Sequence, residues 1–170
     1  LMGLAPDGRR RASVALERLD ADYVPLLLAL EDRRFWWHPG VDPLGVVRAA
    51  GQNLRAGRVV SGASTLTMQL VRVLEPRPRT LVSKVVEVWR ALGLELRLGK
   101  RAVLEAYLTF VPYGGNLEGV EAASWALFGH GPEALSDGEM ALLLAIPQDP
   151  NDRMPGRVAP EALRRARDAV

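Results

Sequence analysis

Cysteine is absent from this sequence, which excludes disulfide bonds, thiol catalysis and zinc–thiolate sites. Long apolar runs are missing as well: VPLLLAL (24–30) and ALLLAI (141–146) fall far short of the roughly 20 residues that span a bilayer. The formal net charge is only +2, and no basic segment is interleaved with aromatic residues, so no nucleic-acid partner is expected. Lysine is also scarce, with two lysines against 20 arginines.

The sequence does contain enough apolar material for one core. Hydrophobic residues make up 48% of the 170 residues, and a chain of this size hides roughly two-thirds of its unfolded surface. We therefore expect residues 1–170 to form one domain. Because the chain starts in mid-pattern at Leu1 rather than at a methionine, we expect this domain to come from a longer, membrane-anchored protein.

Helical periodicity runs through most of the chain and predicts an all-α class. Asp22 and Asp42 are N-cap candidates, Gly99 ends a long apolar stripe, and Ser136 with Glu139 forms a capping box. No alternation of period two lasts long enough to indicate a sheet. The predicted helices span 22–35, 42–57, 80–98, 101–110, 136–146 and a tail from Pro160, with PYGGN (112–116) as a break.

The first candidate for chemistry is the segment EDRRFWWHPGVD (31–42). Glu31 follows LLLAL directly, so its carboxylate lies at the edge of an apolar helix, where a general base would be placed. Asp32 and the two arginines that follow would orient it or bind an anion. The alternative is a solvated helix end with Glu–Arg pairs, and for Glu31 alone this is the commoner arrangement.

Two further segments carry polar groups in unusual density. SGASTLTMQL (61–70) places Ser64, Thr65 and Gln69 near a helix start, which suits phosphate or sugar binding but equally suits a helix cap. RPRTLVSKVVEVW (77–89) contains a lysine and a glutamate three residues apart. This arrangement suits a phosphate site, or else a surface salt bridge worth under ~1 kcal/mol.

Taken in order, these segments closely resemble glycosyltransferase family 51, the peptidoglycan glycosyltransferase domain of class A penicillin-binding proteins. EDRRFWWHPGVD, GASTLTMQL, SKVVE with LGLE, and LEAYLTFVPYGGN (104–116) match four spaced motifs of that family. TLTMQL, PYGGN and AASWALFG resemble its penicillin-binding protein 1C subtype. The resemblance implies a lysozyme-like, two-lobed helical fold, with a large head lobe and a small jaw lobe that faces the membrane.

The resemblance also implies roles for individual residues. Glu31 would be the general base that activates the 4-hydroxyl of the acceptor lipid II. That oxygen would attack the growing strand with inversion, form a β-1,4 bond and release undecaprenyl pyrophosphate. Glu87 would be the second catalytic glutamate. The substrate-binding residues would be Asp32, Phe35, Ser64, Thr65, Gln69, Arg72, Arg79 and Lys84.

Cofactor and partners follow from the same resemblance. It leaves open whether Glu87 positions a divalent cation, Mg²⁺ or Mn²⁺. The expected partners are lipid II, the growing glycan strand and the membrane surface, which the jaw would meet through residues 43–60. A transpeptidase domain is implied in the parent protein, at the outer, periplasmic face of the bacterial cytoplasmic membrane. Three residues depart from the family pattern: Ser83, Met68 and Thr109.

Two other functions compete with this one. A lysozyme-like lytic transglycosylase or glycosidase also needs a catalytic glutamate, but it acts as an acid and has no pyrophosphate to neutralise. A non-catalytic module that binds lipid II or membrane is the second alternative. The cationic third segment argues against the first alternative, and the presence of both glutamates argues against the second.

Overall fold

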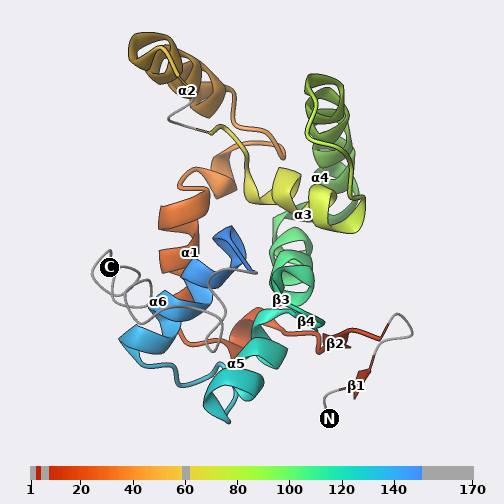
Figure 1. The fold of residues 1–170 in the computed structure, drawn as a ribbon, viewed down its shortest axis with the longest axis vertical. Coiled ribbons are helices and arrows are strands. Elements are labelled where there is room, and N and C mark those ends of the chain that lie inside the picture. Colours follow the sequence, from red (N-terminus) through yellow and green to blue (C-terminus); the bar gives the residue numbers. More distant parts are fainter. Residues whose placement is uncertain (1–2, 5–7, 59–61, 151–170) are drawn as a thin grey trace. The chain divides into compact units, whose positions relative to one another are not determined.

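The computed structural model describes residues 3–4, 8–58 and 62–150, so the predicted tail helix from Pro160 lies outside the described residues. Helices dominate these residues (Figure 1), which confirms the all-α class. The chain divides into two compact units. One unit comprises residues 28–104, and the other comprises residues 1–27 together with 105–170.

The unit of residues 28–104 holds the three segments that the sequence singled out. It contains the end of α1 (Tyr23–Glu31), a 3-10 turn η2 (Phe35–Trp37), α2 (Pro43–Ala56), α3 (Leu66–Leu74) and most of α4 (Leu81–Phe110). The predicted start of α2 is confirmed, because the Asp42 side chain accepts a hydrogen bond from Gly45 N at 3.0 Å. Residues of α3 and α4 form a small core in which Met68, Val71 and Ala91 are buried.

Two helix ends differ from the prediction. Helix α1 ends at Glu31 rather than near residue 35, because the next side chain, Asp32, bonds to groups outside the helix. The predicted break at Gly99 is present as a kink. Helix α4 continues through it, but Gly99 has φ 76° and ψ 167°, which only glycine adopts readily.

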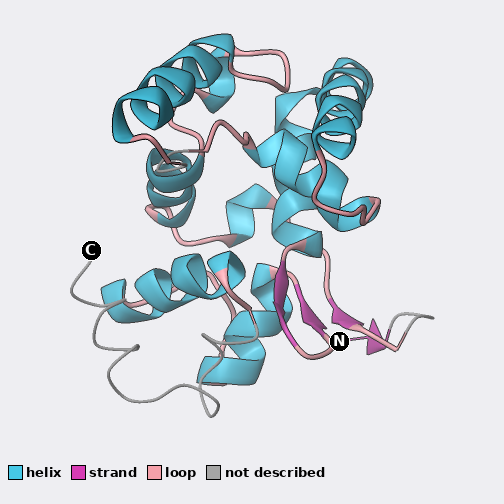
Figure 2. Ribbon diagram, turned by 45° about the horizontal axis from the view of Figure 1, so that its top comes forward, coloured by secondary structure: helices cyan, strands magenta, loops and turns pink. Residues whose placement is uncertain are grey.

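The second unit combines helices with a small sheet, visible in Figure 2. Its strands are β1 (Gly3–Leu4), β2 (Arg10–Arg11), β3 (Pro112–Gly114) and β4 (Leu117–Glu118), in the order β1-β2-β4-β3. The β2–β4 pair is parallel, and the other two pairs are antiparallel. This sheet was not predicted, because strands of two or three residues are too short to show alternation.

The helices of this second unit are η1 (Leu16–Arg18), α5 (Val120–Phe128), α6 (Asp137–Ala145) and η3 (Ile146–Gln148). The sequence predicted α6 but not the other three. The predicted capping box is confirmed, since Ser136 N donates to Glu139 Oε2 at 2.8 Å. Pro147 lies just beyond the end of α6, where the chain tightens into the 3-10 turn.

Several large apolar side chains of the 28–104 unit lie exposed. On α2 these are Leu44, Val46, Val47 and Leu54, and on the first part of α4 they are Leu81, Val82, Val85, Trp89 and Leu96. None of the helices in the described part of the chain is both long and apolar enough to cross a membrane.

Candidate active site

Glu31 is the last residue of α1, at the end of the apolar run that the sequence displays. Its carboxylate is half-buried, and Oε2 accepts a hydrogen bond from Gln69 Nε2 at 3.0 Å. Because Gln69 belongs to α3, the first and second predicted segments meet at this bond. A neutral amide orients a carboxylate without neutralising its charge, so Glu31 retains the ability to accept a proton.

Asp32 fixes the backbone directly after Glu31. Its side chain is buried and accepts two hydrogen bonds, from His38 Nε2 at 2.9 Å and from Leu66 N at 3.0 Å. Leu66 N is one of the first amides of α3, which have no acceptor within their own helix. Asp32 therefore ties the end of α1 to the beginning of α3, and His38 secures it from the intervening loop.

The start of α3 is held by a second buried contact. The Thr65 hydroxyl caps the helix by accepting from Met68 N at 3.2 Å, and it donates to Gly40 O at 2.6 Å. Gly40 has φ 89°, and a Cβ there would lie 2.6 Å from Ala91 O. Only glycine therefore allows the loop after Glu31 to approach α4 this closely. Thr65 was predicted to bind substrate, but its hydroxyl is engaged in fixing the loop to α3.

A chain of charged groups joins α3 to α4. Arg72 donates to Glu87 through Nε and Nη2, both at 2.8 Å. Lys84 Nζ donates to Ser64 Oγ at 2.6 Å and to Glu87 Oε2 at 3.3 Å. Two cations thus share one buried carboxylate, and four of the predicted residues come together here.

The neighbours of these groups shift their pKa values. The Arg72 guanidinium, bonded to both oxygens, lowers the pKa of Glu87 below its usual range. Burial lowers the pKa of Lys84, and the attraction of Glu87 opposes this only in part. Lys84 therefore loses its proton more readily than an ordinary surface lysine does.

Helix α3 brings the base and the cations together. Gln69, which holds Glu31, and Arg72, which pairs with Glu87, lie three residues apart and so share one face of α3. The α3 residue that holds the Glu31 carboxylate and the α3 residue that pairs with Glu87 are therefore about one helical turn apart. Such an arrangement suits a reaction in which a hydroxyl attacks while an anion departs.

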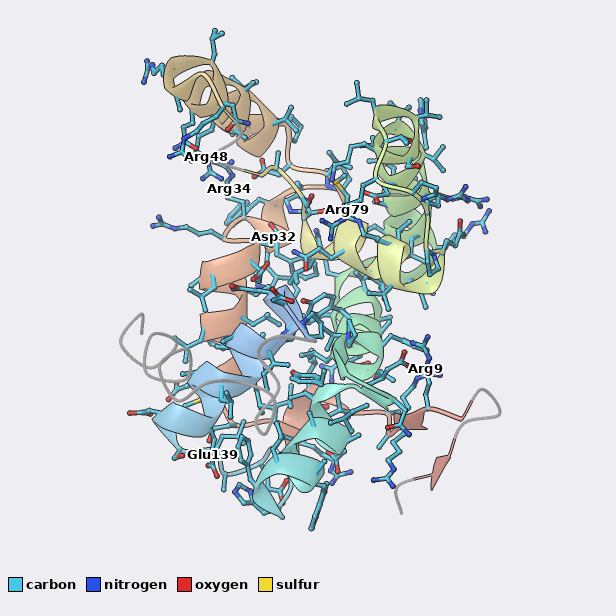
Figure 3. The ribbon with its side chains drawn as sticks, viewed as in Figure 1. Arg9, Asp32, Arg34, Arg48, Arg79 and Glu139 are labelled. Carbon is cyan, nitrogen blue, oxygen red and sulfur yellow. The ribbon has the colours of Figure 1, made fainter. Side chains whose placement is uncertain are left out.

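A pocket of about 560 Å³ opens beside Glu31. Arg34 and Arg48 lie near each other at its wall, above the end of α1 where Asp32 is found (Figure 3). Arg34 is anchored to Asp42 by Nη2 at 2.6 Å, which fixes its guanidinium in place. The pocket is lined by Ala29, Leu30, Glu31, Asp32, Arg33, Arg34, Asp42, Gly45, Arg48, Gly62, Ala63, Ser64 and Thr65. The pocket therefore combines three arginines with three carboxylates, and one of these carboxylates is the candidate base Glu31.

Two predicted site residues lie apart from these contacts. Phe35 was predicted to bind substrate, but its side chain is 0% exposed beneath the loop. Arg79 is exposed in the segment between α3 and α4, and it does not take part in the Arg72–Glu87–Lys84 contacts.

Sequence reasoning missed two contributors to the site: His38 holds Asp32, and Arg48 lines the pocket. Arg34 is one of the two arginines expected to orient Glu31 or bind an anion, and it also lines the pocket. Arg34 and Asp42 are eight residues apart and joined by a loop, so helical spacing could not predict their ion pair.

The described residues do not offer an evident metal site. No group of three or more His, Asp or Glu side chains in the described part of the chain is arranged to hold a metal ion. Both oxygens of Glu87, the residue considered for this role, are bonded to Arg72 and Lys84. A divalent cation needs several oxygen ligands, which this carboxylate does not gather.

Comparison with known families tests the resemblance that the motifs carry. The model of the transglycosylase family matches residues 2–170. The chain belongs to the transglycosylase family. This confirms the family identified from the motifs.

Transglycosylase relatives also agree with the predicted subtype. Penicillin-binding protein 1C of Escherichia coli is 48% identical over 96% of this chain. Penicillin-binding protein 1A of Aquifex aeolicus is 41% identical over 84%, and penicillin-binding protein 1B of Haemophilus influenzae is 36% identical over 95%. The chain spans only about a fifth of the length of these relatives, 21%, 20% and 21% respectively.

Proposed function

We propose that this transglycosylase domain polymerises lipid II into β-1,4-linked glycan strands, with Glu31 as the general base. The observation that carries the proposal is that one face of α3 contacts both groups, Glu31 through Gln69 and the Glu87–Lys84 pair through Arg72. Glycosyl transfer from a lipid pyrophosphate needs a base for the attacking hydroxyl and cations for the departing anion. The residues of α3 that contact the base and belong to the cation group, Gln69 and Arg72, are about one helical turn apart.

Glu31 activates the attacking hydroxyl. Its carboxylate takes the proton from the 4-hydroxyl of the acceptor sugar while that oxygen forms a bond to the anomeric carbon of the donor strand. The bond from this carbon to the pyrophosphate oxygen breaks on the opposite face, so the configuration inverts. Gln69 keeps the carboxylate oriented, and Asp32 holds the backbone on which it stands.

Arg72 and Lys84 stabilise the departing pyrophosphate. When the glycosidic bond to the lipid breaks, its electron pair stays on the pyrophosphate, whose charge grows. Arg72 and Lys84 are held ready by Glu87, which prevents their mutual repulsion from spreading them apart. Lys84 also bonds to Ser64 on the pocket wall, so its ammonium group is directed toward the bound substrate.

The pocket beside Glu31 is the proposed seat of the acceptor. Its arginines suit the acceptor's own pyrophosphate, because guanidinium groups bind phosphate oxygens in pairs. Arg34 is the best prepared of them, since Asp42 fixes its direction. Phe35, being buried, acts on the substrate only through the loop that it anchors.

We further propose that the domain works at the outer face of the cytoplasmic membrane, within a longer anchored protein that also carries a transpeptidase domain. Leu44, Val47 and Leu54 lie exposed on α2 beside Arg48 and Arg55, as expected of a surface that meets anionic lipid. The predicted membrane-facing stretch 43–60 ends at residues outside the described ones.

One experiment separates this function from both rivals. The complete protein is supplied with lipid II in one reaction and with finished glycan strands in another, each with and without a metal chelator, and the products are resolved on a gel. We expect strands from lipid II and intact finished glycan. Cleaved glycan without new strands would instead establish the lysozyme-like alternative. Binding of lipid II with neither reaction would establish a non-catalytic module.

The lowered pKa of Lys84 gives a prediction about alkaline pH. If the charged ammonium stabilises the departing pyrophosphate, the polymerisation rate falls as the pH rises through this lowered pKa. In Lys84→Arg the guanidinium stays charged, so the fall should shift to higher pH. The measurement is the rate of strand formation against pH.

The control for this pH profile is Arg97→Lys, which places an ordinary exposed lysine on α4 of the same unit. Its profile should match that of the parent protein. Coincident alkaline limbs for the parent and Lys84→Arg would remove Lys84 from the leaving-group role.

A further inference from the structure

The second lysine of the chain lies in a buried cluster that the proposed reaction does not use. Lys100 forms an ion pair with Glu95, whose side chain is 6% exposed. The Thr67 hydroxyl on α3 donates to Glu95 Oε2 at 2.7 Å. Lys100 Nζ also lies 4.3 Å above the centre of the Phe35 ring. Burying an ion pair is costly, so its presence here calls for a reason beyond stability.

The kink at Gly99 explains how this pair forms. Residues five apart lie on different faces of a straight helix, so Glu95 and Lys100 would not meet on one. The left-handed backbone of Gly99 redirects α4 immediately before Lys100. No Cβ contact lies within 4 Å at Gly99, so close packing does not require a glycine there; the positive φ does. The ion pair between Glu95 and Lys100 thus depends on the kink at Gly99.

The cluster reaches Glu31 by two routes. Through Phe35 it holds the turn after α1, where the ring lies edge-on to His38 with centroids 6.3 Å apart. His38 in turn donates to Asp32, the neighbour of Glu31. Through Thr67 the cluster holds α3, the helix whose Gln69 bonds to the Glu31 carboxylate.

We infer that Lys100 and Glu95 are positioning residues for Glu31: the ion pair at the kink of α4 fixes Phe35 and Thr67, and thereby the two elements that orient the catalytic carboxylate. The inference rests on the proposed role of Glu31 as the general base. Lysine suits this place because its compact ammonium contacts the ring face and the carboxylate at once. The 20 arginines elsewhere in the chain make this choice distinctive.

The chain contains a matched control for this cluster. In the other unit, the Arg11 guanidinium lies 4.5 Å above the centre of the Phe110 ring and pairs with Glu118. The side-chain exposures are also alike, 22% for Arg11 and 21% for Lys100. Both sites combine a cation, a buried carboxylate and an aromatic ring, but Arg11, Phe110 and Glu118 belong to the unit that does not contain Glu31.

The test compares Lys100→Met with Arg11→Met in the complete protein. Lipid II polymerisation is measured as kcat and KM, and thermal unfolding is followed for each variant, with assays well below both midpoints. We expect Lys100→Met to lower kcat roughly 10- to 100-fold with little change in KM, because a small displacement of a reacting group has effects of this size. Arg11→Met should lower the unfolding midpoint but leave kcat unchanged. Lys100→Arg should restore part of kcat.

Three outcomes would overturn the inference. One is an unchanged kcat in Lys100→Met; another is an equal loss of kcat in Arg11→Met; the third is no recovery in Lys100→Arg. If Lys100→Met does not fold, the double variant Lys100→Met with Glu95→Gln removes both charges and is assayed for the same loss of kcat. An active Glu31→Gln variant would refute the base itself, whereas an inactive one beside a fully active Lys100→Met would refute only the positioning role.

Discussion

Glu31→Gln is expected to lower the rate of glycan-strand formation by roughly 10²- to 10⁴-fold, the range that general bases contribute. The replacement keeps the size of the side chain, and its amide can still bond to the Gln69 side chain, which normally donates to Glu31. What it removes is the ability to accept the proton of the attacking hydroxyl. Lipid II binding should therefore change little.

The measurement is strand formation from lipid II on a gel, together with lipid II binding. Glu75→Gln provides the control, because Glu75 is a glutamate of the same unit that is paired with Arg77 and lies outside the pocket beside Glu31. That variant should retain the parent rate. Strand formation by Glu31→Gln near the parent rate would mean that another group takes the proton.

Measuring strand formation and lipid II binding separately distinguishes the proposed function from the non-catalytic module and from the lysozyme-like enzyme. A non-catalytic module would show the same lipid II binding in both variants and no strands in either. A lysozyme-like enzyme would lose cleavage of finished glycan in Glu31→Gln, since its glutamate also carries the proton. Only the proposed function links the loss of polymerisation to Glu31 while lipid II binding persists.

Much of the fold was predictable where local chemistry decides it. Asp42 caps α2 and Ser136 with Glu139 caps α6, and both were evident in the sequence because a cap acts within four residues. The end of α1 was not predictable, because the Asp32 side chain bonds to His38 and to Leu66 N, which both lie outside that helix. A bond between residues 34 positions apart leaves no periodic mark in the sequence.

The candidate site was also predictable only in part: its residues could be identified from the sequence, but their contacts could not. The motif order identified Glu31, Gln69, Arg72, Lys84 and Glu87, and the structure brings these residues together around α3. Their individual tasks did not follow from the sequence. Phe35 and Thr65 have the residue types of sugar-binding positions, yet one ring is buried and one hydroxyl is engaged as a helix cap.

The Lys100 cluster was beyond sequence reasoning for a different reason. Lys100 and Glu95 are five residues apart, a spacing that indicates no contact on a helix. Their pairing depends on the backbone at Gly99, and a glycine in a helical pattern does not reveal the φ that it adopts. The contact with Phe35 then joins residues 65 positions apart.

Asp32→Asn tests the join between α1 and α3 and should produce the largest loss of stability. Both partners of Asp32 are donors, and each bonds to a different oxygen: His38 Nε2 to Oδ1 and Leu66 N to Oδ2. Asparagine offers one acceptor oxygen and one NH₂ group. It can keep the bond from Leu66 N only by turning its NH₂ toward His38, which must then change tautomer and place its proton on the buried Nδ1 atom. We expect the free energy of unfolding to fall by about 2–3 kcal/mol. The midpoint of thermal unfolding should fall by roughly 4–12 °C for a chain of this size.

The same change should slow polymerisation, because the backbone that carries Glu31 is no longer fixed to α3. Thermal unfolding and strand formation are the two measurements, and Asp20→Asn is the control. Asp20 Oδ1 accepts a hydrogen bond from Asp22 N at 3.1 Å near the surface, and the oxygen of an asparagine can replace it there. An unchanged midpoint in Asp32→Asn would show that the buried pair of hydrogen bonds does not hold the two helices together. A lowered midpoint with full activity would show that Glu31 is oriented by Gln69 alone.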